Sequence, residues 1–143
     1  MSLRAHFHDE WIHTKKPIVY HDKDRRVLTD DLTAHWSVWE IRVQSGYCTD
    51  GASIPRIAWR VVGHPFEEYE AAAIVHDVLY DSEHFSRETA DRCFNDLMRA
   101  CGVGKIRRAI IFKAVRMFGG PTWNKHTPES IADAKQYLSV SYA

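Results

Sequence analysis

The sequence predicts an α+β fold, with a small antiparallel β-sheet from the N-terminal half packed against a C-terminal bundle of about three to four helices. Two observations predict this class. The first part of the chain is rich in β-branched and aromatic residues separated by turn-forming residues, whereas the later part carries apolar residues at helical spacing. At 143 residues the chain is long enough to bury one core. We therefore expect a single domain over residues 1–143, without repeats or linkers.

The first half supplies the predicted strands. The segment PIVYHDKDRRVLTDD (17–31) predicts two short strands around a charged turn. In SVWEIRVQSG (37–46) apolar and polar side chains alternate, which is the pattern of a half-buried strand. The loop YCTDGASIP (47–55) follows, and its Asp-Gly pair favours a turn.

The second half supplies the predicted helices. The first runs from about Pro65 to Asp81. Ser86 is a suitable N-cap for the second, SRETADRCFNDLMRACG, which Gly102 ends. The third, GKIRRAIIFKAVRMFGG, is apolar nearly all round, so we expect it to be largely buried. Thr127, followed by proline, begins a short last helix, PESIADAKQYL.

Charge and composition argue against several functional classes. Lys and Arg number 19 and so do Asp and Glu, so no net basic field predicts a nucleic-acid partner. No run approaches the roughly 18 apolar residues of a transmembrane segment, and the N-terminus lacks the apolar core of a signal peptide. Three cysteines without a CxxC pair fit a reducing compartment or incidental thiols.

The stretch AAAIVHDVLYDSE (71–83) divides into two helical faces. Five apolar residues fill one continuous arc, which predicts the core-facing stripe: Ala71, Ile74, Val75, Val78 and Leu79. The other arc holds a polar set around the small Ala73: His76, Asp77, Tyr80 and Asp81. An ordinary solvent face would carry Lys, Glu and Gln. The second arc is therefore a candidate site, with a wet surface as the alternative.

The helix that follows offers a partner for this face. The connection between the two helices is short, which predicts an antiparallel hairpin, and counting outward from the turn brings His76 level with Asp91. Asp91 borders the apolar stripe of its helix, where a carboxylate normally has a partner. Arg87, one turn earlier, is one candidate. Arg116 lies among apolar residues, so we expect it to pair inside the protein with Asp77 or Asp91.

Four ordered motifs carry a family resemblance. GYCTDGASIP, AAAIVHDVLYD, SRETADRCF and AVRMFGGPTW, which lie between Gly46 and Trp123, resemble the domain of unknown function 1353 of phages and prophages. The resemblance implies a phage or prophage origin and other phage proteins as partners. It also implies a location in the host bacterial cytoplasm or in the virion. It carries no established activity.

A second resemblance concerns chemistry. HDVLYD followed by ADRCFNDLMRAC is similar to the active-site helix pair of secreted and viral phospholipases A₂. The resemblance implies that His76 activates water, that Asp91 orients His76 and that Tyr80 supports the hydrogen bonds. An imidazole held by a carboxylate on one nitrogen can act as a base through the other. The substrate implied is a lipid or cell-envelope ester.

The same resemblance implies calcium as cofactor, with Asp77 as its ligand. Calcium takes six to eight oxygen ligands, so the CTDGAS loop would have to supply the Asp50 carboxylate and backbone oxygens. Asp50, Gly51 and Ser53 are the candidate binding residues of this loop. Arg87 and Arg116 are the other candidate binding residues. A structural alternative stays open, in which Asp77 accepts hydrogen bonds from backbone N–H groups of the TDGAS loop and holds this loop against the helix.

The sequence leaves two functions open. One is a non-enzymatic virion, tail or assembly component in which the motifs lock loop to helix. The other is a hydrolase with a His76–Asp91 site and calcium at Asp77. Whether the protein is an enzyme is not decided by these patterns. A zinc site at His6, His8 and His13 is a weaker alternative, because no fourth ligand follows at metal spacing.

Overall fold

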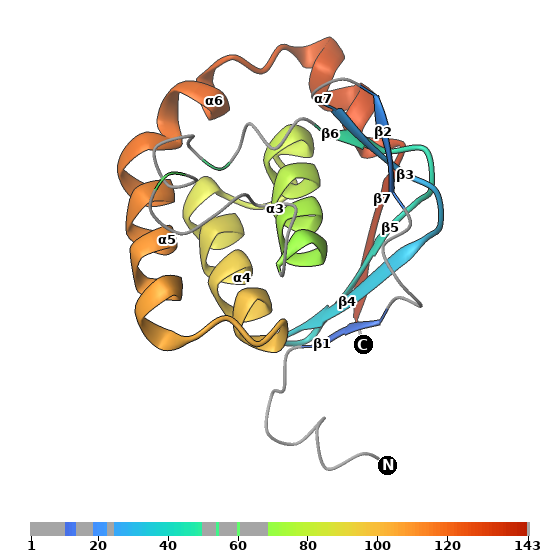
Figure 1. Cartoon of the computed structure of the whole chain (residues 1–143). Helices are drawn as coiled ribbons and strands as arrows, with labels where there is room; N and C mark the ends of the chain where they lie inside the picture. The colour runs from blue at the N-terminus through green and yellow to red at the C-terminus, as the bar shows by residue number, and fades with distance from the viewer. Residues whose placement is uncertain are drawn as a thin grey trace.

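The computed structural model of the chain describes residues 11–13, 19–22, 25–49, 54, 60 and 69–142. Most helices form one side of the molecule and two antiparallel sheets the other, with the last helix beside the strands (Figure 1). The predicted α+β class is confirmed.

The described strands form two sheets. One has four strands in the order β1-β4-β5-β7, and the other has three in the order β2-β3-β6. Their bounds are β1 (Trp11–His13), β2 (Val19–Asp22), β3 (Arg25–Leu28), β4 (Leu32–Trp36), β5 (Trp39–Val43), β6 (Cys48–Thr49) and β7 (Leu138–Tyr142). The pairing of β2 with β3 confirms the two strands predicted around the charged turn.

A hairpin of β4 and β5 forms the middle of the four-stranded sheet. Its register pairs Trp36 with Trp39 next to the turn and Leu32 with Val43 at the far end. The alternation seen in the sequence holds, because Ile41 and Val43 are buried and Arg42 between them is exposed. One face of this hairpin therefore belongs to the core.

The C-terminal strand β7 was not predicted. We expected the last helix to include Leu138, but that helix ends at Lys135 and the chain then pairs with β5, so that Leu138 lies opposite Val43. Ser and Val alternate in this segment, which suits a strand. The open edge of β5 supplies the backbone hydrogen-bond partners of this strand. Five residues of local sequence give no sign of such a distant partner. The sheet thus joins the two ends of the sequence.

Four of the five described helices lie close to the predicted ranges, whereas the short helix from Gly120 to Asn124 was not predicted. Their bounds are α3 (Glu70–Ser82), α4 (Arg87–Ala100), α5 (Lys105–Phe118), α6 (Gly120–Asn124) and α7 (Pro128–Lys135). The Ser86 side chain accepts a hydrogen bond from the backbone of Thr89, as expected of the N-cap of α4. Gly102 follows α4 with a φ of 88°, a conformation that glycine adopts without strain. Of the predicted helical stretch after Pro55 the structure describes Arg60, which is helical, and the predicted helix start at Pro65 lies outside the described residues.

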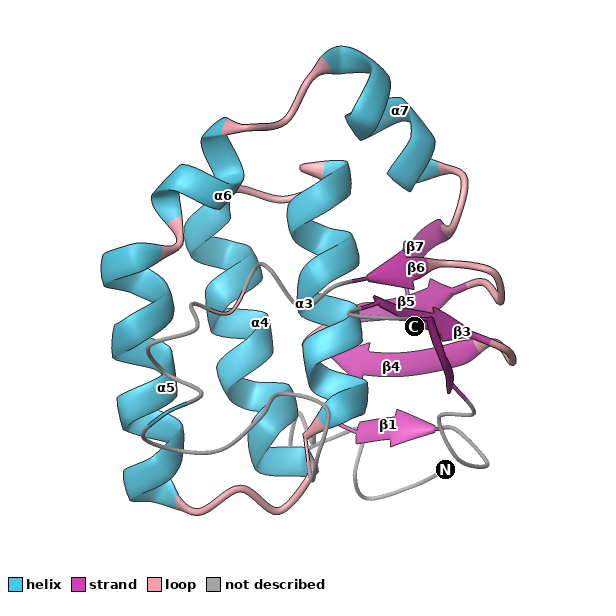
Figure 2. Cartoon of the chain, turned by 45° about the horizontal axis from the view of Figure 1, so that its top comes forward, coloured by secondary structure: helices cyan, strands magenta, loops and turns pink. Residues whose placement is uncertain are grey.

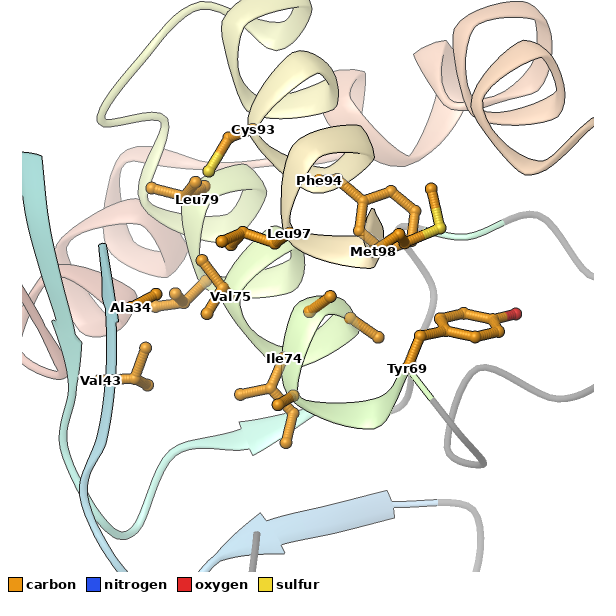
Figure 3. Close-up of a cluster of buried hydrophobic side chains, with 14 of the residues drawn as sticks. Ala34, Val43, Tyr69, Ile74, Val75, Leu79, Cys93, Phe94, Leu97 and Met98 are labelled. Atoms are coloured by element: carbon orange, nitrogen blue, oxygen red, sulfur yellow. The ribbon is translucent and has the colours of Figure 1, made fainter. Parts of the chain in front are cut away.

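Helices α3, α4 and α5 lie side by side, with α3 and α4 nearer the strands (Figure 2). Both contact the four-stranded sheet, while α5 packs against α4 and α7 against α3. Side chains from the sheet, α3 and α4 fill the core between them (Figure 3). No helix within the described ranges combines the length and apolarity needed to cross a bilayer.

The prediction that α5 is largely buried is wrong. Within this helix only Ile111 and Val115 are buried, whereas Ile106 is 79% exposed and Met117 61% exposed. Because α5 packs through one arc on α4, the rest of its surface faces away from the core. The apolar composition of α5 alone did not reveal that the helix packs on α4 through one side.

Candidate functional site

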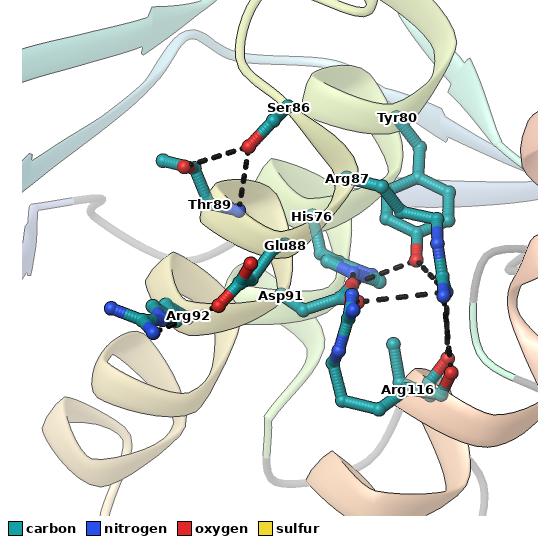
Figure 4. Close-up of polar contacts among 10 residues, drawn as sticks. His76, Tyr80, Ser86, Arg87, Glu88, Thr89, Asp91, Arg92 and Arg116 are labelled. Carbon is teal, nitrogen blue, oxygen red and sulfur yellow. Dashed lines mark hydrogen bonds and ion pairs between the residues drawn. The ribbon is translucent and has the colours of Figure 1, made fainter.

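The predicted contact between His76 and Asp91 is present. The two side chains come from the middle of α3 and from the second turn of α4, and Nε2 of His76 lies 2.7 Å from Oδ1 of Asp91 (Figure 4). The helices form the expected antiparallel hairpin, since only four residues separate them. The spacing of His76 and Asp91 from the short turn in the sequence therefore predicts that they meet.

Three further side chains surround the Asp91 carboxylate. The Tyr80 hydroxyl donates to Oδ1 at 2.7 Å, and Nη1 of Arg116 donates to Oδ2 at 2.6 Å. Nη1 of Arg87 lies 3.7 Å from the same Oδ2 and 3.2 Å from the carbonyl oxygen of Val115. The prediction that Arg116 pairs internally is confirmed, with Asp91 as its partner. We call His76, Tyr80, Arg87, Asp91 and Arg116 the Asp91 network.

Burial governs the charges in this network. Burial lowers the pKa of His76, and the hydrogen bond and charge of Asp91 oppose that shift only in part. Burial alone would raise the pKa of Asp91, but the hydrogen bonds from His76, Arg116 and Tyr80 outweigh it and hold the pKa below its ordinary value. Burial and the neighbouring Asp91 raise the pKa of Tyr80. The favoured state is a neutral imidazole beside an ionised carboxylate.

This geometry limits what His76 can do. With Nε2 donating to Asp91, the other ring nitrogen is the one that carries the lone pair of a neutral imidazole. A general base must reach a substrate or water, however, and His76 has 0% exposure and stacks on Phe94 at a centroid distance of 4.4 Å. In this arrangement the network holds α3, α4 and α5 together. The wet-surface alternative for the polar face of α3 is wrong, because His76, Asp77 and Tyr80 are all buried.

Asp77 connects α3 to the motif loop. The hydroxyl of Thr49, at the end of β6, donates to Oδ2 of Asp77, and both residues are buried. Asp77 thus holds the start of the loop, as in the structural alternative, but the donor is a side-chain hydroxyl and not the predicted backbone N–H groups. Asp50, Gly51 and Ser53 lie outside the described residues, so their predicted binding roles stay predictions.

Metal binding stays a prediction as well. Within the described ranges, no group of three His, Cys, Asp or Glu side chains has the arrangement of a metal site. The calcium prediction rests on Asp77 together with Asp50, and Asp50 is outside those ranges. The zinc alternative falls on His6 and His8, which are also outside, and on His13, whose side chain is not described.

A second polar cluster, which the sequence did not predict, lies at the end of α3. The Tyr47 hydroxyl donates to Oδ2 of Asp81 at 2.6 Å. His126 lies between two carboxylates, with Nδ1 2.9 Å from Oε2 of Glu83 and Nε2 3.5 Å from Oδ1 of Asp81. His126 follows a short helix in a segment without periodicity, so no sequence signal placed it here. Each polar residue of the HDVLYD motif thus ties α3 to another part of the chain.

Gly119 explains part of the AVRMFGGPTW motif. A Cβ atom at this position would lie 2.6 Å from the carbonyl oxygen of Val115 and 2.8 Å from the hydroxyl of Tyr80. It would also lie 3.1 Å from Nη1 of Arg87. The backbone at position 119 can approach the Asp91 network this closely only because glycine has no side chain.

Comparison with known proteins finds two relatives in Sinorhizobium fredii (strain NBRC 101917 / NGR234). The uncharacterized protein y4iH is 37% identical over 95 residues, which cover 65% of this chain and 39% of that protein. The uncharacterized protein y4jT is 35% identical over 86 residues, which cover 59% of this chain and 25% of that protein. The chain thus spans less than half of the length of either relative. No solved structure matches it significantly.

A family model described as "Protein of unknown function (DUF1353)" matches residues 13–115, a range that includes β2 to β6 and four residues of the Asp91 network, His76, Tyr80, Arg87 and Asp91, but ends before Arg116. This match covers more than half of the chain, so the chain belongs to the DUF1353 family.

Proposed function

We propose that this chain is a non-enzymatic component of a phage or prophage assembly, located in the host cytoplasm or in the virion, and that α5 carries its contact surface. The observation that supports this most is the set of large apolar side chains that α5 exposes. Ile106 is 79% exposed, Met117 61% and Phe118 48%, with Ile110 at 40%. Single exposed apolar residues are common on monomers, but a contiguous patch marks an interaction site.

The exposed residues of α5 follow the helical repeat. Ile106, Ile110 and Met117 stand four and seven residues apart, so they lie along one face of the helix, with Lys113 among them. The buried Ile111 and Val115 point to the opposite side, toward α4. This continuous outer face, made of Ile106, Ile110, Lys113 and Met117, is the α5 face.

Charge indicates the chemistry of the partner. Helix α5 contains five basic residues and no acidic one. Two of the basic residues are engaged inside the protein, since Arg116 binds Asp91 and Arg108 donates to the carbonyl oxygen of Val103. Lys105 and Lys113 are exposed beside the apolar residues. The matching partner is another protein of the assembly whose apolar surface is bordered by carboxylates.

Two other observations agree with this role. The His76 ring is fully buried, so the residue that an enzyme would use has no solvent contact in this arrangement. The phage context comes from the resemblance of the four sequence motifs. Because the relatives are longer than this chain, the role of a whole protein that carries this domain is part of the proposal.

The test is particle association. The gene would be tagged in a phage or prophage that carries it, and particles and assembly intermediates would be separated on a density gradient and analysed by mass spectrometry. We expect the wild-type protein in a particle or intermediate fraction. The double variant Ile106→Glu/Met117→Gln should be absent from that fraction. The control variant Val38→Glu, which changes a residue 49% exposed in the β4–β5 turn, should still be found there.

Two results would contradict the proposal. One is absence of the wild-type protein from every particle and intermediate fraction. The other is equal incorporation of the double variant and the wild type. If the double variant instead abolishes binding to anionic phospholipid vesicles and no particle fraction contains the protein, the α5 face is a membrane surface and the assembly role is wrong.

A hydrolase is the second candidate, and the geometry of the Asp91 network favours it specifically. Nε2 of His76 and the Tyr80 hydroxyl both contact Oδ1 of Asp91 at 2.7 Å, the arrangement that the phospholipase resemblance implies. The test is fatty-acid release from phospholipid vesicles with millimolar calcium, comparing the wild type with His76→Gln. Activity that disappears in a folded variant would favour the hydrolase. Calcium binding should also raise the melting temperature.

A further inference from the structure

A pocket separate from the Asp91 network lies where three parts of the chain meet. It is formed by the segment entering β6, the C-terminal end of α3 and the chain from His126 to Tyr137, which includes α7. Its volume is about 290 Å³, which is near the lower limit for small-molecule sites. The residues that carry the argument are Tyr47, Asp81, His126, Asp133 and Tyr137, all of which line it.

The lining of the pocket is acidic. Asp81 and Asp133 both border it, and no lysine or arginine does so among the described residues. His126 also borders it, but each of its ring nitrogens faces a carboxylate, that of Glu83 or that of Asp81. Two aspartates therefore leave the lining with an excess of negative charge whether or not His126 is protonated.

Aromatic rings form another part of the lining. The rings of Tyr47 and Tyr137 have centroids 5.9 Å apart, and both residues line the pocket. The Tyr47 hydroxyl donates to Asp81 at 2.6 Å, which fixes this carboxylate beside the rings. Aromatic faces attract cations through their quadrupole, and neighbouring carboxylates add a direct charge interaction.

We propose that this pocket binds a small organic cation, such as an alkylammonium or alkylguanidinium group. Asp133 and Asp81 supply the countercharge, and Tyr47 and Tyr137 supply aromatic surface. The pocket is a binding site. Cys48 also lines it but does not act there as a thiol nucleophile. A thiol would need a base, and both nitrogens of His126 already face carboxylates. This proposal does not depend on the α5 face.

The test uses pairs of cations and neutral compounds of the same shape. Choline would be compared with 3,3-dimethylbutanol, and butylguanidinium with butylurea, by isothermal titration calorimetry at low and high salt. We expect at least one cation to bind saturably and about tenfold more tightly than its neutral counterpart. Its affinity should fall as salt screens the carboxylates.

Two variants locate the site. Asp133→Asn should weaken binding of the cation about fivefold or more, since it removes one countercharge. Glu129→Gln is the matched control, because Glu129 is an exposed acid of the same helix that does not line the pocket, and it should bind like the wild type. Asp133 is itself exposed, so both variants should fold, which circular dichroism checks. The proposal is wrong if no cation binds at tens of millimolar, if the neutral compounds bind equally well, or if Asp133→Asn has no effect.

Discussion

Nε2 of His76 lies 2.7 Å from Oδ1 of Asp91, and both side chains have 0% exposure. The contact joins the middle of α3 to the second turn of α4 inside the core (Figure 4). A buried carboxylate is stable only when its neighbours compensate the loss of water, so the stability of the hairpin depends on the completeness of the Asp91 network.

Asp91→Ala should therefore destabilise the protein strongly. The change leaves Arg116 without its carboxylate and His76 without its acceptor, and removing one member of a buried charge network costs about 3–5 kcal/mol. Glu88→Ala is the control in the same helix, because its ion pair with Arg92 is exposed and is expected to contribute at most about 1 kcal/mol. Urea unfolding measures both. A loss for Asp91→Ala no larger than that for Glu88→Ala would contradict the account of the network.

Stability should fall as the pH decreases below about 6.5, the ordinary pKa of histidine. Burial lowers the pKa of His76 in the folded state, so the unfolded chain takes up a proton at a pH where the folded chain does not. The free energy of unfolding therefore decreases with decreasing pH until the folded pKa is reached. His76→Gln should be less stable than the wild type near neutral pH but show a smaller slope below pH 6.5. Equal slopes in urea titrations at several pH values would refute the assignment.

Gly119→Ala should destabilise the protein, whereas Gly120→Ala should not. The new Cβ at position 119 would lie 2.6 Å from a backbone oxygen that cannot move freely, and such overpacking typically costs about 1–3 kcal/mol. A Cβ at Gly120 meets nothing within 4 Å, so that change should be neutral or slightly stabilising. Thermal melting of the two variants compares adjacent glycines directly. Similar melting temperatures would show that the close approach at Gly119 is not a constraint.

Glu70 supplies a pH dependence at the other end of α3. Burial raises its pKa to about 6, partly offset by the charge of Arg26. The folded state thus binds the proton more tightly than the unfolded state, so the contribution of Glu70 to stability decreases as the pH rises from about 4.5 to about 6. Glu70→Gln should raise the melting temperature near neutral pH and lose this advantage below about pH 4.5. A variant less stable than the wild type at both pH values would contradict this sign.

Local spacing in the sequence was sufficient to predict the helical hairpin and the residues that meet across it. His76 and Asp91 lie at similar distances from a short turn, and this symmetry fixes their contact without knowledge of the rest of the fold. Arg116 was predictable for another reason, because a charge surrounded by apolar neighbours needs an internal partner.

Contacts between distant segments could not be predicted in this way. The pairing of β7 with β5 depends on an edge that only the folded sheet creates, and the exposure of α5 depends on its packing through one side on α4. His126 and the pocket beside it arise where α3, α7 and the start of β6 meet. None of these carries a local pattern that identifies its partner.

The pairing of β5 with β7 also bears on how the chain folds during synthesis on the ribosome. Residues near 40 pair early with β4, but find their second strand partner only when residues near 140 have been made. The β4–β5 hairpin therefore emerges early with an unprotected edge, and sheets completed by late-synthesised segments are exposed to aggregation in the interval. A nascent chain stalled before Leu138 would be the form most dependent on chaperones.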